Sequence, residues 1–278
     1  MAFKTIFAVI SVDQNDDDLQ AAIDICAAAE AHLTVMVVGL GTVPPYAGYD
    51  GVSTGIWLDE REREVERLAV RAAAAKEKLK GAGISYDVQD IFSEYVRASD
   101  IIAEHALYAD LTLIGGDMLA DSDMRTLAID GALFQSPTPV LLLPKHRPAT
   151  LAPQRVLVAW DSRNEAGRAV KHAMDMLVRA ERVSVVMVDP EARSGTQGEE
   201  PGADVATYLA RQGIKVSVDV LSSGGREISD VLRQHALDID ADLIVMGGYG
   251  HSRMRERIFG GVTHSMIEDA TAPVFMAR

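Results

Sequence analysis

The 278-residue sequence contains a single cysteine, Cys26, and this scarcity excludes an intrachain disulfide. A lone thiol is typical of a reducing compartment, and we interpret Cys26 as a small buried residue of a helix. No stretch approaches the run of about 18 apolar residues that a membrane-spanning helix needs. The first residues lack the long apolar core and the small-residue cleavage site of a signal peptide. We therefore expect a cytoplasmic protein without a membrane partner.

Positive charge is also scarce, because 27 Lys and Arg residues stand against 41 Asp and Glu residues, for a net charge of −14. An acidic surface repels phosphate backbones, so we expect no nucleic-acid partner, although one locally basic pocket is compatible with this balance. The sequence contains no GxxxxGK[ST] loop, no Ser-His-Asp set and no metal-ligand spacing. These absences favour a protein that is not an enzyme and that holds no metal through its own side chains.

What the sequence does have is an internal repeat. The segment RASDIIAEHAL at 97–107 matches EISDVLRQHAL at 227–237, and each match runs into an apolar strand that ends in two glycines. Each copy also opens and closes with an apolar run, in the same order. We therefore predict two domains that arose by duplication, residues 1–146 and residues 153–278, joined through the proline-containing segment PKHRPATLAPQ.

Strands alternate with helices in each copy. Several of the expected strands are continuous apolar runs, which is typical of a parallel sheet covered on both faces. The sequence thus predicts an α/β fold with two tandem doubly wound domains. In the second copy we expect strands at 155–160, 183–188, 215–221, 242–247 and 273–277, and helices at 164–180, at 203–213, around 228–236 and after the last glycine loop. The first copy adds a longer loop, 41–55, and a longer helix, 58–80.

The segment from Gly247 to Thr263 carries most of the functional information. Ligands of doubly wound sheets bind beyond the carboxyl ends of the strands, and this segment follows the fourth strand of the second copy. Its glycines, spaced Gly-x2-Gly-x9-Gly, allow backbone N–H groups to approach an anion, and the glycine pair at 260–261 precedes an apolar helix. The pattern indicates a phosphate cradle, and the alternative is a flexible strand-to-helix connection.

This spacing, with the opening VLVAWDSRNEAGRAV and the closing TAPVFMAR, resembles the universal stress protein family. The resemblance covers both halves, so it implies a tandem member with five parallel strands per domain, the adenine nucleotide alpha-hydrolase-like fold. It also implies a cofactor, ATP or the related ADP or AMP, with or without Mg²⁺. The residues it assigns to binding are Ala159, Trp160 and Asp161 near the adenine and ribose, Val188 at the base, and Met246, Gly247, Gly250, His251, Arg253, Gly260, Gly261 and Val262 at the ribose and phosphates.

Two departures from the family pattern qualify this assignment. Position 261 is Gly where ATP-binding members commonly carry Ser or Thr, so a hydroxyl donor is lost. In the first copy no glycine follows Gly115-Gly116 at the required spacing, and Asp117, Asp121 and Asp123 bring negative charge to the place of a phosphate. Among the binding residues that the resemblance implies, only the aspartate after the first strand, Asp13, is retained in the first copy. We expect the first domain not to bind ATP in this way, and its 41–55 loop to be free for a small apolar ligand or a partner.

The function implied is a regulatory module of the stress response, with an adenine nucleotide and protein partners. Two alternatives stay open: a nucleotide-free regulatory or protein-interaction module, and a slow ATP hydrolase. The closing strands PVLLLP and PVFMA are expected to pair within one chain as a pseudo-dimer, and a further homodimer is left open. We interpret His105 and His235 as helix-packing residues, and the run Asp16–Asp18 as carboxylates that suit a helix dipole.

Overall fold

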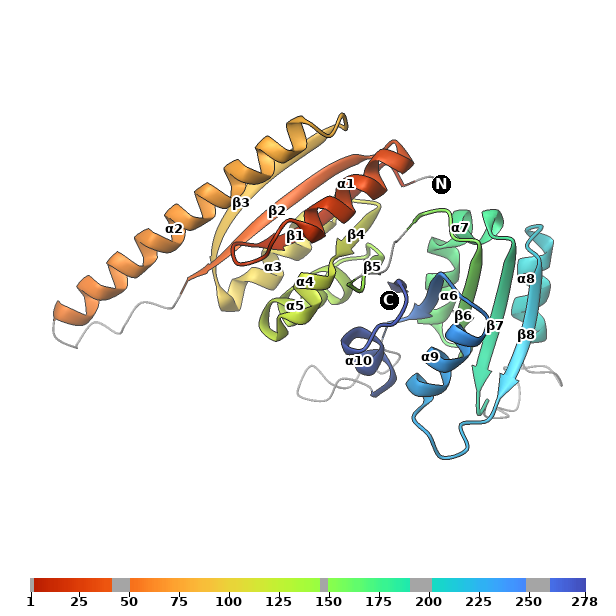
Figure 1. The fold of residues 1–278 in the computed structure, drawn as a ribbon. Helices are drawn as coiled ribbons and strands as arrows, with labels where there is room; N and C mark the ends of the chain where they lie inside the picture. Colours follow the sequence, from red (N-terminus) through yellow and green to blue (C-terminus); the bar gives the residue numbers. More distant parts are fainter. Residues whose placement is uncertain (1–2, 42–50, 146–149, 191–201, 249–260) are drawn as a thin grey trace. The chain divides into compact units, whose positions relative to one another are not determined.

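The computed structural model describes residues 3–41, 51–145, 150–190, 202–248 and 261–278. The chain divides into two compact units, residues 3–138 and residues 139–278, called here the first and second unit. In both, strands alternate with helices, and most strand pairs are parallel (Figure 1). The α/β fold predicted from the sequence is therefore confirmed.

The first unit begins at a buried strand and ends in a series of short helices. Its elements are β1 (Thr5–Ser11), α1 (Asp17–Ala29), β2 (His32–Gly41), α2 (Gly51–Lys80), β3 (Tyr86–Glu94), α3 (Tyr95–Ala106), β4 (Leu111–Ile114), α4 (Gly116–Ala120), α5 (Ser122–Ile129) and the π-helix η1 (Asp130–Phe134).

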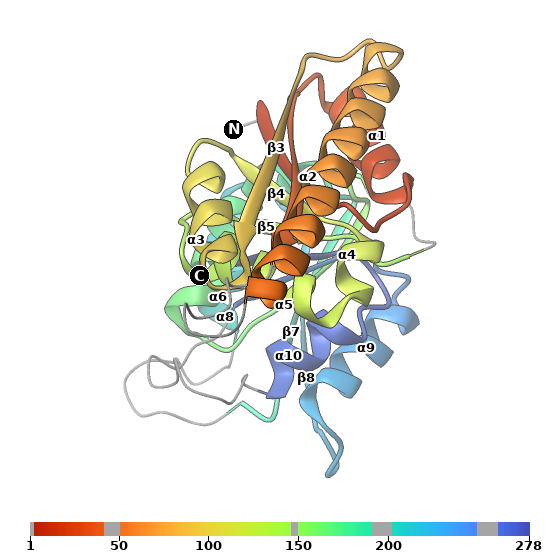
Figure 2. The ribbon, with the colours of Figure 1, turned by 90° about the vertical axis from the view of Figure 1, so that its left-hand side faces the viewer.

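Four parallel strands form the sheet of the first unit, in the order β3-β2-β1-β4. Strands β1 and β4 are buried along nearly their whole length, whereas most residues of the edge strand β3 are half-buried or exposed. Helix α2 lies along β2 and β3 (Figure 2), and α3 packs on α5 and η1. This burial pattern is what the continuous apolar runs predicted.

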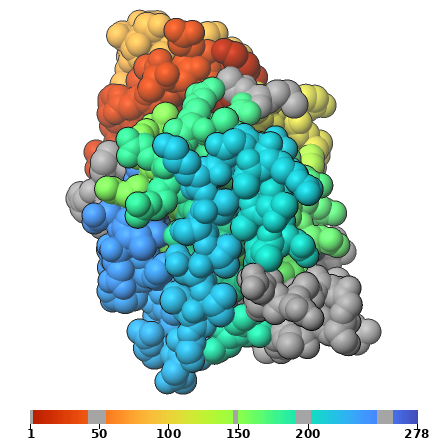
Figure 3. Space-filling model, turned by 90° about the vertical axis from the view of Figure 1, so that its right-hand side faces the viewer, coloured from red at the N-terminus to blue at the C-terminus, as the bar shows by residue number. Residues whose placement is uncertain are grey.

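The second unit begins one strand before the second copy of the repeat. Its elements are β5 (Val140–Leu142), β6 (Arg155–Ala159), α6 (Asn164–His172), α7 (Met174–Arg179), β7 (Arg182–Val188), α8 (Ala203–Arg211), β8 (Val216–Leu221), α9 (Ile228–Asp238), β9 (Leu243–Gly247), α10 (Gly261–Glu268) and β10 (Val274–Ala277). Figure 3 shows the side of this unit on which α8 and the edge strand β8 are exposed.

Five parallel strands make up most of the second sheet, in the order β10-β9-β6-β7-β8. The sixth strand, β5, comes from the sequence of the first copy and pairs antiparallel with β10, with Leu141 opposite Phe275. Phe275 is fully buried, and burial of such a side chain contributes about 1.5–3 kcal/mol. The expected pairing of PVLLLP with PVFMA is thus seen, although β5 is grouped with the second unit.

Two helices differ from their predicted bounds. The helix expected at 164–180 is interrupted at Ala173, which has φ −82° and ψ 0° and separates α6 from α7. The helix expected at 58–80 begins at Gly51, so it includes the last residues of the predicted 41–55 loop, whose residues 42–50 lie outside the described part of the chain. Glycine, serine and threonine at 51–55 are weak helix formers, which is why the sequence indicated a loop there.

Candidate functional site

The carboxyl ends of the central strands of the second unit form the candidate site. Ala159 at the end of β6 is level with Met246 of β9 on one side and with Val186 of β7 on the other. From β6 the chain adds β7 and β8 on one side of this strand. It then crosses over and adds β9 and β10 on the other side. The edge beside β6 and β9 is therefore the switch point at which doubly wound sheets bind ligands.

The residues after β6 continue the strand and then turn outward. The backbone N–H of Trp160 donates to the carbonyl of Val186 at 2.9 Å, which keeps Trp160 in the sheet beyond the last strand residue. Asp161 is exposed, and its Oδ1 accepts from the backbone N–H of Arg163 at 3.1 Å. Between them Ser162 adopts a left-handed conformation with φ 62°. The turn holds the Asp161 carboxylate at the strand edge, where its Oδ2 lies 3.6 Å from Nε of Arg163.

Val188 ends β7 and is level with Leu221 of β8. The next residue, Asp189, has φ 44°, and its two carboxylate oxygens accept from the backbone N–H of Ser223 at 3.2 Å each. Hydrogen bonds from Ser223 hold the pKa of this carboxyl below its ordinary value. Asp189 therefore ties the β7 and β8 ends together beside Val188.

Gly247 closes β9 at a point where no side chain fits. A Cβ atom there would lie 2.6 Å from the backbone nitrogen of Ala166 and 2.7 Å from the carbonyl carbon of Glu165. The first turn of α6 thus touches the end of β9, and only glycine permits this approach. The next residue, Gly248, donates its N–H to the carbonyl of Ala277 at 2.9 Å.

Helix α10 supplies the other described part of the predicted cradle. Gly261 and Val262 form its first turn, where backbone N–H groups have no partner within the helix. The Arg233 guanidinium of α9 donates to the carbonyl and hydroxyl oxygens of Ser265, at 3.0 and 2.9 Å, and so fixes α10 to α9. Gly250, His251, Arg253 and Gly260 lie outside the described residues, so their placement stays a prediction.

The first unit has a different arrangement at the same edge. Asp13, which follows β1, is paired with Arg67 of α2. In the first turn of α4, two backbone N–H groups donate to the carboxylate of Asp18, Asp117 to Oδ1 at 3.0 Å and Met118 to Oδ2 at 2.9 Å. The sequence indicated negative charge here from Asp117, Asp121 and Asp123, and it missed Asp18.

The signal for Asp18 was present but ambiguous. Three successive carboxylates open α1, and all three suit the positive end of a helix dipole. In the structure they divide: Asp16 pairs with Arg71 at 2.8 Å, Asp17 is exposed, and Asp18 retains 7% of its accessible surface.

A polar cluster lies under α9, away from the strand ends. Ser184 donates to Asp219 at 2.7 Å, and His235 Nε2 lies 3.3 Å from the same carboxylate oxygen. The hydroxyl bonds to the carboxylate rather than to the imidazole, so the histidine cannot act as its base and the cluster is not a nucleophilic triad. His105, by contrast, bonds through Nδ1 to the Ile101 carbonyl of its own helix at 2.8 Å.

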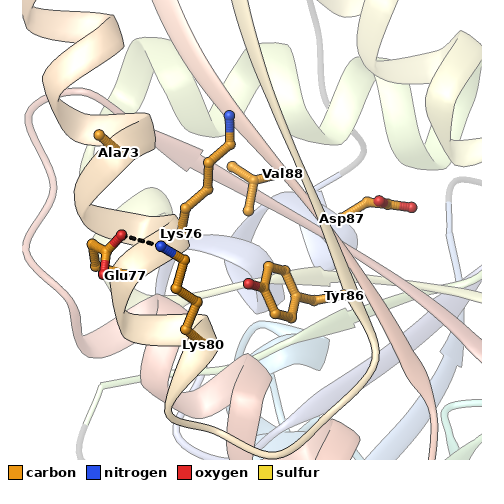
Figure 4. Close-up of a pocket in the computed structure, with 7 residues that line it drawn as sticks. All are labelled: Ala73, Lys76, Glu77, Lys80, Tyr86, Asp87 and Val88. Carbon is orange, nitrogen blue, oxygen red and sulfur yellow. Dashed lines mark hydrogen bonds and ion pairs between the residues drawn. The ribbon is translucent and has the colours of Figure 1, made fainter.

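An open groove of about 360 Å³ lies between α2 and β3 of the first unit (Figure 4). Lys76 extends toward Val88 there, away from Tyr86, and Lys80 turns toward Glu77, with which it is paired. The groove lies at the amino end of β3, opposite the strand edge at which ligands bind. No group of His, Cys, Asp and Glu among the described residues has the arrangement of a metal site, and no helix there is long and apolar enough to cross a membrane.

Comparison with known proteins finds a family model that matches the second half of the chain and solved structures that resemble the whole fold. Residues 153–278 match the model of the Universal stress protein family. No curated protein matches the sequence significantly. The crystal structure of a universal stress protein from Archaeoglobus fulgidus DSM 4304 superposes with a TM-score of 0.63 at 18% identity, over 98% of this chain and 96% of that chain. A structure from Pseudomonas aeruginosa UCBPP-PA14, provisionally named a universal stress protein, gives 0.62 at 18% identity, over 99% and 93%. At this identity the likeness concerns the fold.

Proposed function

We propose that this chain is a tandem member of the universal stress protein family whose second unit binds ATP or a related adenine nucleotide. The family match of residues 153–278 and the fold likeness over both halves support the tandem assignment. The proposal includes two universal stress protein domains, at 1–146 and 153–278, and a cytoplasmic location for the protein.

The observation that carries the nucleotide proposal is the closeness of Gly247 to the first turn of α6. A glycine that no side chain can replace stands at the switch point, directly before the glycine-spaced loop. The exposed carboxylate of Asp161 lies at the end of the neighbouring strand, and the first turn of α10 follows the loop. Two features that an adenine nucleotide needs are thus offered by the described residues: an acceptor for hydroxyl or amino groups, and backbone donors for phosphates.

Each residue has a role that its chemistry allows. The Asp161 carboxylate accepts hydrogen bonds from the ribose or the adenine, and Val188 contacts the base with an apolar side chain. The N–H groups of Gly261 and Val262, in the first turn of α10, face the phosphates. Mg²⁺ would bind through the phosphates and water, because the described residues offer no cluster of carboxylates for it.

We further propose that nucleotide binding serves regulation and not turnover. Asp161 is the only carboxylate among the predicted binding residues, and its Oδ1 is already engaged with the Arg163 backbone. A general base or a metal ligand beside the phosphates is thus not provided by the described residues. Phosphate release from ATP at a rate above the buffer blank would favour the hydrolase alternative instead.

Isothermal titration of ATP and Mg²⁺ into the full chain tests the proposal. We expect one site per chain, and Asp161→Ala should weaken binding about 10- to 100-fold, the value of a hydrogen bond to a charged group. Asp13→Ala is the control, because it removes a carboxylate that follows the first strand of the first unit and should leave the affinity unchanged.

The other outcomes are equally informative. Two sites per chain would mean that the first unit also binds. Absence of heat up to millimolar ATP would reject the nucleotide proposal and favour a nucleotide-free interaction module. Repeating the titration with EDTA separates the contribution of Mg²⁺.

A further inference from the structure

The first unit contains a buried carboxylate at the place where its strand ends would receive an anion. Asp18 lies in the first turn of α1, and its carboxylate contacts the first turn of α4. There it accepts the backbone N–H groups of Asp117 and Met118 at 3.0 and 2.9 Å. One carboxylate oxygen serves each amide, so both donors at the start of α4 are satisfied from within the chain.

Gly115 shows how tightly this carboxylate is enclosed. A Cβ atom on Gly115 would lie 2.1 Å from Cγ of Asp18 and 2.3 and 2.5 Å from its two oxygens. The backbone conformation of Gly115, with φ −80° and ψ 172°, is open to any residue. Glycine is therefore required here because of the carboxylate and not because of the local backbone.

The corresponding glycine of the second unit is enclosed differently. Gly247 corresponds to Gly115, because each is the first glycine of the pair that follows the matched helix and strand. The atoms nearest to a Cβ on Gly247 are the backbone nitrogen of Ala166 and the carbonyl carbon and Cβ of Glu165, at 2.6–2.8 Å. Backbone of α6 encloses this glycine, whereas a carboxylate encloses Gly115.

We propose that Asp18 is a built-in anion that closes the strand-end cradle of the first unit against a ligand phosphate, because its carboxylate occupies the two amide donors of α4. A phosphate that approached the first unit would find both amides occupied and a like charge at contact distance.

A double-mutant cycle tests the closure of the first unit without any nucleotide. Gly115→Ala should markedly lower the urea midpoint of the wild-type chain, because its methyl group collides with the Asp18 carboxylate. In an Asp18→Ala background the same change should cost less than half as much. Equal costs in both backgrounds would overturn the proposal.

Hydrogen exchange gives a second measurement of the same contact. Exchange at the amides of Asp117 and Met118 should rise at least tenfold in Asp18→Ala, while the amides of β1 stay protected. Asp17→Ala is the control, because Asp17 is exposed in the same turn and should leave both amides unaffected. If Asp18→Ala does not fold, Asp18→Asn keeps the shape and should show a smaller rise. Unchanged exchange in folded protein would contradict the assignment.

Discussion

Cys26 has no exposed surface in α1, and burial raises the pKa of its thiol to about 12. Because the thiolate is the reactive form, we predict that the folded protein resists alkylation by iodoacetamide at pH 8 over hours. The urea-unfolded chain should react at the rate of a free thiol, which serves as the control. Fast modification of native protein would show that the α1 region opens readily.

Gly261 offers a second prediction at the residue scale. A Cβ atom at this position meets no atom of the described residues within 4 Å, so Gly261→Ser should fold normally and supply a hydroxyl beside the proposed phosphate position. We expect the Kd for ATP to fall about fivefold, since one hydrogen bond contributes about 1 kcal/mol. Titration calorimetry measures this, and an unchanged or weaker affinity would place the hydroxyl away from the phosphates.

Gly247→Ala is the contrasting variant. Its methyl group would meet backbone atoms of α6 at 2.6–2.7 Å, and backbone cannot move aside as a flexible side chain can. This variant should lose both ATP binding and thermal stability, in contrast to Gly261→Ser.

Single residues were predictable from the sequence where local pattern decides their position. Asp161, Val188 and Gly247 follow buried strands, so their place at one edge of a parallel sheet could be inferred before the structure. Asp18 could not, because its role depends on a turn almost 100 residues later in the chain. The pattern of three carboxylates does not say which of them turns inward.

At the scale of the element, α5 depends on its first residue. Asp121 precedes the helix, and its carboxylate accepts from the backbone N–H groups of Asp123 and Met124, each at 3.1 Å. Asp121→Ala should therefore lower the free energy of unfolding by about 1 kcal/mol, the usual effect of removing such a cap. Urea unfolding tests this. Asp123→Ala removes an exposed carboxylate from the first turn of the helix and should have a smaller effect.

Strands were easier to predict than the helices that follow them. Continuous apolar runs locate buried strands within a residue or two, because both faces of a parallel sheet exclude water. The π-helix η1 had no such signal, since it depends on tertiary contact. A Cβ atom on Gly131 would lie 2.5 Å from the carbonyl oxygen of Ser99, so this glycine permits the close packing of η1 on α3. Local propensity contains no information about that neighbour.

At the scale of the whole molecule, the boundary between the compact units precedes the boundary between the repeats. We predict that a fragment of residues 139–278 has a higher urea midpoint than a fragment of residues 153–278, because only the longer one keeps β5 paired with β10. Leu141→Lys in the longer fragment should remove most of the difference, since Leu141 is fully buried. Equal midpoints for the two fragments would show that β5 contributes nothing to the second unit.

The tandem organisation was visible in the sequence because the repeat retains motifs in a fixed order. The grouping of β5 with the second unit was not fully predictable, because the run PVLLLP has the same strand pattern whichever sheet it joins. The arrangement of the two units as a pseudo-dimer, and any further homodimer, remain predictions.

Asp18 also makes the stability of the two units depend differently on the concentration of a ligand. A ligand that binds only the folded state adds stability that grows with its concentration, about 2.7 kcal/mol when the ligand is at a hundred times its Kd. The carboxylate of Asp18 is part of the chain, so its occupancy is the same in a starved cell and in a well-fed one. Under the proposed function, the second unit would gain and lose stability with the nucleotide pool, while the first would stay constant beside it as an internal reference.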